Sequence, residues 1–124
     1  MASGEGIRYR HGPLRLRFAT ELKHPITRGF KRLDLIDESY WKLHGALPEE
    51  RTLGWSLEDD AWQPQLWTVE RGKGRVFVSI PGHYAWSFDD PLFRVLLLRG
   101  MAWAAHESVD RFNPLVWPAA SIAP

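Results

Sequence analysis

Apolar and basic side chains alternate with a period of two over residues 14–18, which read Leu-Arg-Leu-Arg-Phe. This pattern is typical of a β-strand that buries one face and exposes the other. A second short strand is expected over residues 33–37, Leu-Asp-Leu-Ile-Asp, running on into residues 38–41. Between them lies the segment 24–29, His-Pro-Ile-Thr-Arg-Gly, in which Pro and Gly predict a turn-rich connector.

Two further β-rich segments, 65–70 and 75–80, are separated by Arg-Gly-Lys-Gly and predict a β-hairpin. The second segment is apolar at most of its positions, so we expect it to be covered on both faces. Residues 44–64 contain several Gly and Pro breaks and an acidic cluster. They are expected to be the least regular part of the chain.

A C-terminal helix is expected from about residue 91 to residue 106. Asp90 is a favourable N-cap, and the proline after it suits the first helical position. The segment is hydrophobic almost all round, which predicts deep packing, with Arg94 and Arg99 marking a narrow solvent face. The prolines farther on predict an extended tail over residues 107–124.

The composition is that of an ordinary globular protein. The chain has 124 residues, of which 44% are hydrophobic and 25% charged, so we expect one domain with a core. It contains no cysteine, which excludes disulfides, thiolate metal sites and a cysteine nucleophile. Its seven tryptophans are many for this length and either bury large aromatic area or form an aromatic binding surface.

Charge is unevenly distributed although the net charge is only +1. Residues 1–32 carry a net charge of +6, and residues 33–62 carry −6. The basic opening segment fits a solvated edge strand whose charges discourage aggregation. A phosphate-binding arm is the alternative, but aromatic residues such as Tyr9 and Phe18 are few there. We therefore expect no nucleic-acid partner.

Targeting signals are not apparent. Residues 1–12 contain no apolar core of a signal peptide, and the apolar stretch 95–98 ends at Arg99. The expectation is a soluble protein without a membrane partner. It would be cytoplasmic if Met1 is the natural start.

A search for short catalytic motifs indicates no particular reaction. No phosphate-binding loop, dinucleotide fingerprint, zinc-protease motif or nucleophile elbow is present, and no cofactor is indicated. The five histidines lack the helical spacing of metal ligands, although a metal site built from distant His and carboxylates stays open. His83 is the most suggestive, because it follows a β-rich segment at the place where open parallel sheets bind ligands. The alternative is that His83 caps the following turn.

Asp37, Glu38 and Tyr40 place two carboxylates and a phenol near the end of an expected strand. Successive strand side chains point to opposite faces, so only one carboxylate should reach a given site. Paired-carboxylate chemistry is therefore disfavoured, and one of the two is expected on the solvated surface.

Two stretches together resemble the trehalose-utilisation family, often called ThuA-like. The first is His24–Gly29, with the pattern H-P-I-T-x-G, followed by Asp37–Tyr40, with the pattern D-E-x-Y. The second is Gly72–His83, with the pattern G-K-G-R-V-F…G-H, followed by P-x-F and R-G-x-x-W-A patterns farther on. The stretches occur in the family's order and cover roughly residues 9–106.

The resemblance implies an α/β fold, the flavodoxin-like three-layer sandwich of class I glutamine amidotransferases. A complete domain of that kind is much longer than this chain. Residues 1–124 are therefore expected to form a single partial domain, its C-terminal half, with a β-hairpin and a C-terminal helix. The parallel sheet of such a fold would need a partner surface to complete it.

The resemblance also implies site residues. His83 is the candidate acid/base residue or ligand, and His24, Asp37, Glu38 and Tyr40 are expected to line the same pocket. Glutaminase chemistry is not implied, because the family lacks the amidotransferase cysteine. Trp86 is the tryptophan nearest to His83 in the sequence, so we expect it to stack on a sugar.

Two functions of different classes follow. The first is a domain that binds and processes a small sugar, trehalose or a related one, with His83 moving the proton. The alternative is a non-catalytic fragment that completes its sheet with a second copy or with a partner that supplies the missing half.

Overall fold

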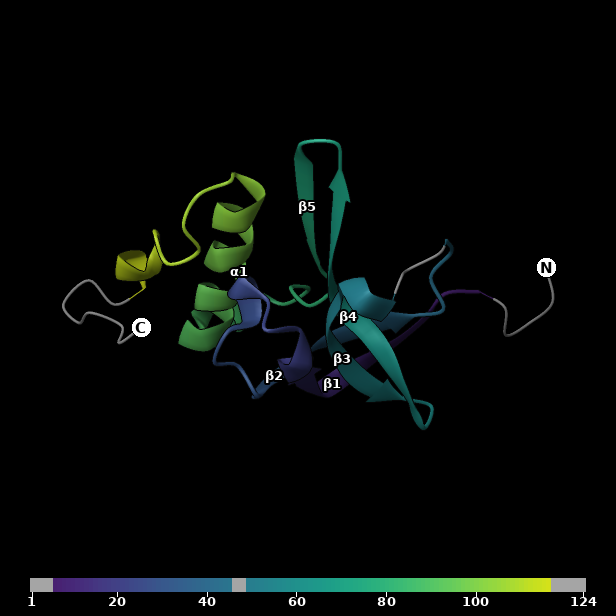
Figure 1. Ribbon diagram of the computed structural model, residues 1–124. Helices are drawn as coiled ribbons and strands as arrows, with labels where there is room; N and C mark the ends of the chain where they lie inside the picture. Colours follow the sequence, from purple (N-terminus) through teal and green to yellow (C-terminus); the bar gives the residue numbers. More distant parts are fainter. Residues whose placement is uncertain (1–5, 46–48, 117–124) are drawn as a thin grey trace.

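The computed structural model describes residues 6–45 and 49–116 (Figure 1). Five strands form one sheet in the order β2-β1-β3-β4-β5. The strands are β1 (Arg8–Phe18), β2 (Arg32–Trp41), β3 (Thr52–Glu58), β4 (Ala61–Arg71) and β5 (Gly74–Ser79), and the helix α1 spans Pro91–Ala104. The helix lies against one side of the sheet (Figure 1).

The pair β1–β2 is the longest ladder and runs antiparallel from Arg8 opposite Trp41 to Arg17 opposite Arg32. The predicted alternation is confirmed: Leu14, Leu16 and Phe18 are buried, while Arg15 and Arg17 between them are exposed. β1 begins earlier than the pattern indicated, because polar residues continue the pairing beyond the apolar core, and β2 extends to Trp41 as expected. The leucines on the inner face of the ladder pack against α1. The outer face carries His11 and Glu38, which meet the loop between β5 and α1.

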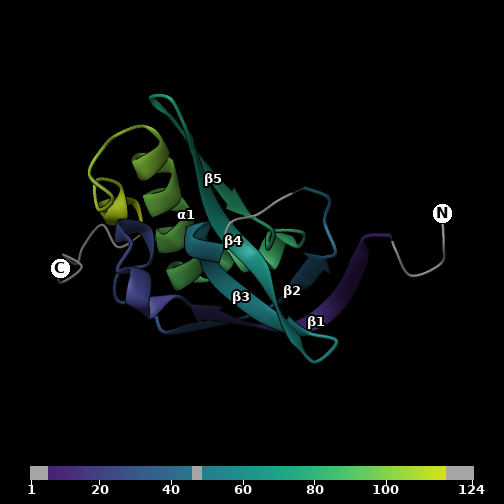
Figure 2. The same cartoon turned by 45° about the vertical axis from the view of Figure 1, so that its right-hand side comes forward.

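The sheet curls so strongly that β2 approaches β4, which is not its neighbour in the strand order (Figure 2). The buried amide of Gln65 joins them: its Nε2 donates to the Tyr40 carbonyl at 2.8 Å, and its Oε1 accepts from the Tyr40 N–H at 3.5 Å. Inside the curl, the Glu58 carboxylate accepts hydrogen bonds from Ser39 at 2.9 Å and Ser56 at 3.1 Å. Backbone and side-chain polar groups are thus paired where the sheet closes on itself.

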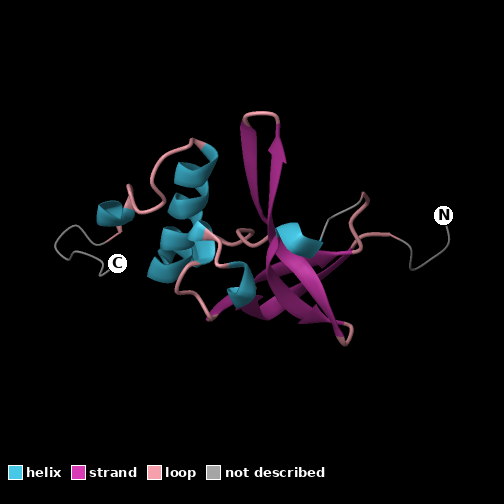
Figure 3. Ribbon diagram, viewed as in Figure 1, coloured by secondary structure: helices cyan, strands magenta, loops and turns pink. Residues whose placement is uncertain are grey.

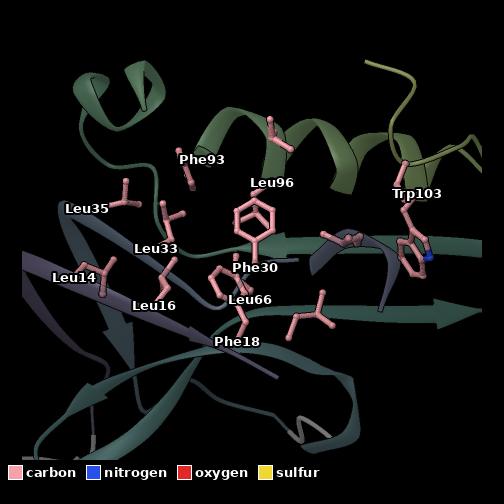
Figure 4. Close-up of a cluster of buried hydrophobic side chains, with 14 residues drawn as sticks. Leu14, Leu16, Phe18, Phe30, Leu33, Leu35, Leu66, Phe93, Leu96 and Trp103 are labelled. Carbon is pink, nitrogen blue, oxygen red and sulfur yellow. The ribbon is translucent and has the colours of Figure 1, made fainter. Parts of the chain in front are cut away.

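Helix α1 begins where the sequence predicts. The Asp90 carboxylate accepts from the N–H groups of Leu92 at 2.9 Å and Phe93 at 3.0 Å, as an N-cap does. Phe93 and Leu96 point from α1 toward the leucines of β1 and β2 (Figure 4). Farther along, a side chain at Gly100 would collide with the Phe77 ring of β5, so the helix and the strand meet at the closest approach that glycine permits.

The solvent face predicted for the helix is partly wrong. Arg99 is buried, because its Nη1 donates to the carbonyls of Arg28 at 2.7 Å and Ile26 at 3.3 Å, and its Nε lies 3.1 Å from Asp110. Met101 is exposed instead. The arginine therefore fastens the helix to the 24–29 connector and to the chain that follows the helix.

Two expectations about the β-strands are wrong. Residues 44–64 are not the least regular part, since they contain β3 and the start of β4. The predicted hairpin is confirmed as β4–β5, but β5 is an edge strand that pairs only with β4 in the described sheet. Val76 is 51% exposed, so β5 is not covered on both faces.

The fold is α/β, with an antiparallel sheet and a C-terminal helix (Figure 3). All four strand pairings are antiparallel, whereas the flavodoxin-like sandwich implied by the resemblance has a parallel sheet. The position of His83 therefore cannot be explained by the ligand-binding edge of a parallel sheet. After the helix, residues 107–116 form turns and a short 3-10 helix (Asn113–Leu115) rather than an extended tail, and residues 117–124 lie outside the described part.

Candidate functional site

The loop between β5 and α1 crosses the outer edge of β2. Asp37 of β2 holds this loop with its fully buried carboxylate, which accepts the backbone N–H groups of Gly82 and His83, each at 3.0 Å. The hydroxyl of Ser87 donates to the same carboxylate. At the edge itself, the indole Nε1 of Trp86 donates to the Ile36 carbonyl at 2.6 Å. The loop that carries His83 is thus fixed to β2 by several hydrogen bonds.

Glu38 reaches the same loop from the other face of β2. Its Oε2 lies 3.0 Å from His83 Nδ1, and its Oε1 lies 3.5 Å from His11 Nε2. Only Glu38 therefore faces the imidazole of His83, whereas Asp37 binds the backbone of the same loop. Asp37 and Glu38 do point to opposite faces, but the loop wraps around the edge strand and meets both. Neither is on the solvated surface, because both are buried.

His11 of β1 belongs to this cluster and was missed by sequence reasoning. It lies directly opposite Glu38 in the β1–β2 ladder, and its Nδ1 is hydrogen-bonded to the hydroxyl of Tyr84. The His11 and His83 ring centroids are 5.9 Å apart. The period of two over residues 14–18 offered a signal, since extending it places His11 on the polar face with Arg15.

Tyr40 completes the cluster on the β2 side. Burial raises the pKa of the Tyr40 phenol, and its hydrogen bond to Glu38 raises that pKa further. The Tyr9 ring lies 6.2 Å from the Tyr40 ring. The phenol therefore stays protonated near neutral pH and can donate a hydrogen bond.

The cluster combines a buried carboxylate with accessible imidazoles. The Glu38 side chain is 5% exposed, whereas the side chains of His83 and His11 are each 49% exposed. The contact between Glu38 Oε2 and His83 is close in distance but not aligned as a hydrogen bond, and Oε2 has no other hydrogen-bond donor among the described residues. With Nδ1 of His83 facing Glu38, Nε2 is the ring nitrogen left for a ligand.

Of the two remaining predicted residues, one lies beside the His83 cluster and the other lies elsewhere. Trp86 lies beside the cluster, stacked on Tyr84 with ring centroids 4.3 Å apart. His24 takes a structural position: its Nδ1 accepts the Ile26 N–H at 3.2 Å, and its ring packs on Trp103 at 5.2 Å. Burial lowers the pKa of His24. The structure gives His24 no contact with the His83 cluster.

The described residues do not support a metal site built from distant histidines and carboxylates. Across residues 6–45 and 49–116, no group of three or more His, Asp or Glu side chains is placed to hold a metal ion.

The chain belongs to the trehalose utilisation family, ThuA, whose family model matches residues 5–104. This match confirms the resemblance drawn from the sequence motifs and contains all residues of the cluster. No curated protein and no solved structure matches the chain. In the described part, no helix has the length and apolar character needed to cross a membrane.

Proposed function

We propose that the chain binds a small sugar, trehalose or a related one, beside His83, and that His83 moves a proton to or from a sugar hydroxyl. The observation that carries this proposal is the pair formed by His83 and Glu38, in which a half-exposed imidazole lies 3.0 Å from a buried carboxylate. An imidazole titrates near the operating pH and is suited to general acid–base catalysis. The family's role in trehalose utilisation supports a sugar as the ligand.

Each neighbour has a distinct part in this proposal. Glu38 lies beside Nδ1 of His83 and would accept its proton once the ring turns into line, which leaves Nε2 for the sugar. Asp37 acts as a positioning residue, because it binds the backbone of the loop and not the ligand. Tyr40 and Trp86 line the site, with the exposed indole of Trp86 available to pack on a sugar ring.

The test is to incubate the protein with trehalose, maltose and sucrose and to follow each sugar by NMR spectroscopy. The proposal expects that one of them is converted and that His83→Ala lowers the rate by at least about 100-fold. His106→Ala is the matched control, since His106 is exposed and its ring nitrogen is hydrogen-bonded to the Lys73 carbonyl, in another part of the described structure. Full activity of His83→Ala, with a folded control, would refute the proposal.

A second candidate is an interaction module that completes its sheet with a second copy or a partner. The free edge of β5 favours it, since an unpaired strand edge with the exposed Val76 can accept an added strand. Under this second proposal, the chain would form a complete flavodoxin-like, glutamine amidotransferase-like sandwich only together with a partner. That partner would supply the other strands and helices of the fold.

Light scattering after size exclusion distinguishes this candidate. Pairing through β5 predicts a mass above the 14.3 kDa of one chain, and Val76→Lys should return the protein to a monomer. Leu115→Lys is the control, because Leu115 is exposed outside the sheet. A wild-type monomer that unfolds cooperatively would exclude pairing with a second copy.

A further inference from the structure

A groove of about 640 Å³ lies along β1 and β2 beside the end of the β3–β4 hairpin, where β1 and β3 are paired only at Arg17 and Phe18. This volume falls within the range of small-molecule sites, roughly 300–1,000 Å³. Its lining includes Arg15, Asp34 and Ile36 of the ladder and Leu57 and Trp62 of the hairpin. None of these residues was a candidate in the sequence.

Several of the residues that line the groove lie on the same face of the ladder as His11 and Glu38 of the His83 cluster. Three opposed pairs follow one another on that face: Arg15 with Asp34, Pro13 with Ile36, and His11 with Glu38. Because alternate residues of a strand share a face, Ile36 and Glu38 are neighbours there, about 7 Å apart. One elongated ligand can therefore contact the groove and His83 at the same time.

The hairpin wall is aromatic and accessible. Trp62 is 46% exposed, and Arg17 lies over its ring at 5.5 Å from the centroid. Leu57 pairs with Trp62 across the hairpin and is also exposed. An indole held from one side, with apolar neighbours, offers a flat surface to the C–H face of a pyranose ring.

The polar groups of the groove are already matched in charge. Arg10 binds the buried Glu58 through Nε at 2.8 Å and Nη2 at 2.9 Å, which leaves Nη1 to serve another acceptor. Arg15 donates to Asp34 at 3.2 Å. Since each arginine lining the groove faces a carboxylate, the groove offers planar hydrogen-bonding groups without uncompensated positive charge. Such a lining suits neutral hydroxyl groups better than a phosphate.

We infer that this groove is a second sugar-binding subsite, in which a pyranose ring stacks on Trp62 while the next ring of the same disaccharide lies at His83. Arg10, Arg15 and Asp34 bind the hydroxyls of the ring in the groove. The inference rests on the proposed function for the ring at His83. It adds the place on the surface, and the residues, that hold the second ring of a neutral disaccharide.

The test measures trehalose and glucose binding by isothermal titration calorimetry for wild type, Trp62→Ala and His83→Ala. The inference expects that wild type binds the disaccharide more tightly than glucose and that Trp62→Ala raises the disaccharide Kd by about tenfold or more. Trp55→Ala is the matched control, because Trp55 lines a different hollow on the surface. Circular dichroism of every variant establishes that it is folded.

The outcomes separate the two ideas. If Trp62→Ala binds the disaccharide as wild type does, or if wild type binds no sugar, the subsite is refuted. If inorganic phosphate competes with the sugar for the wild-type protein, the neutral subsite is likewise refuted. If Trp62→Ala loses disaccharide binding while His83→Ala converts the disaccharide at the full rate, the subsite is supported. The same result refutes the proposed catalytic role of His83.

Discussion

The carboxylate of Asp37 accepts the backbone N–H of His83 at 3.0 Å, across 46 positions of sequence. This hydrogen bond joins the edge strand β2 to the loop that carries the imidazole. The same carboxylate also accepts the Gly82 N–H, so the backbone before His83 has little freedom to rotate. The position of the His83 ring therefore depends on a residue that need not touch any ligand.

Removal of this carboxylate should loosen the loop and the fold together. Asp37→Ala leaves the N–H groups of Gly82 and His83 without their acceptor, and each buried unsatisfied donor costs about 1–3 kcal/mol. We expect a loss of about 3 kcal/mol in the free energy of unfolding, measured with urea. Asp34→Ala, which removes an exposed carboxylate from the same strand, should change it by about 1 kcal/mol or less. Equal losses in the two variants would contradict the anchoring role.

Glu58 should make stability depend on acid pH. Burial alone would raise the pKa of Glu58, but hydrogen bonds from Arg10 and Ser39 hold that pKa below its ordinary value. A lowered native pKa means that the stabilisation is present above the unfolded value of about 4.3 and is lost as pH falls through the native value.

Urea unfolding of wild type and Glu58→Gln at several pH values tests this point. Between about pH 5 and pH 3, wild type should lose more stability than the variant, so the two curves should converge toward acid. Other carboxylates, Asp110 among them, titrate in both proteins and cancel in the difference. Curves that stay parallel over this range would show that the carboxylate of Glu58 is not stabilised in the native state.

Protonation of His24 should destabilise the fold, whereas protonation of a salt-bridged histidine stabilises it. Burial lowers its native pKa, so the unfolded chain takes up the proton first as pH falls below about 6.5. Wild type should then lose stability between about pH 6.5 and pH 5, and His24→Asn, which keeps a capping acceptor, should lose less. The measurement is thermal unfolding of both proteins across that range. A steeper loss in the variant would reverse the assignment.

Gly100 should not tolerate a side chain. Gly100→Ala places a Cβ against the Phe77 ring, which must move, and overpacking of this kind typically costs about 1–3 kcal/mol. The double variant with Phe77→Leu should recover part of that loss, since the smaller side chain leaves room for the methyl group. Met101→Ala on the exposed side of α1 is the control and should have little effect. Additive losses in the double variant would mean that the two residues do not share the contact.

The sequence predicted those parts of the fold that depend on interactions between residues close together in the chain. The alternation in β1, the β4–β5 hairpin and the Asp90 cap all depend on neighbours in the sequence. The curl of the sheet does not, because Gln65 meets Tyr40 only after two other strands are in place. Arg99 looked like a surface residue for the same reason, since its carbonyl partners lie on a distant connector.

The sequence indicated several residues of the His83 cluster but not their arrangement. His83, Asp37, Glu38 and Tyr40 lie near one another, with Asp37 at the backbone of the loop and Glu38 at the imidazole. The alternation of strand side chains could not indicate a loop that wraps around the strand edge. The partnership of His11 with Glu38 depends on strand register, which the sequence did not define.

The loop that crosses β2 has a consequence for assembly. By bonding the Ile36 carbonyl through Trp86, it obstructs one border of the described sheet, so β5 is left as the border open to another strand. Association of two copies through β5 would place the β2 border, with its Trp86 contact, at each outer end of the joined sheet. A covered border disfavours the addition of further strands there.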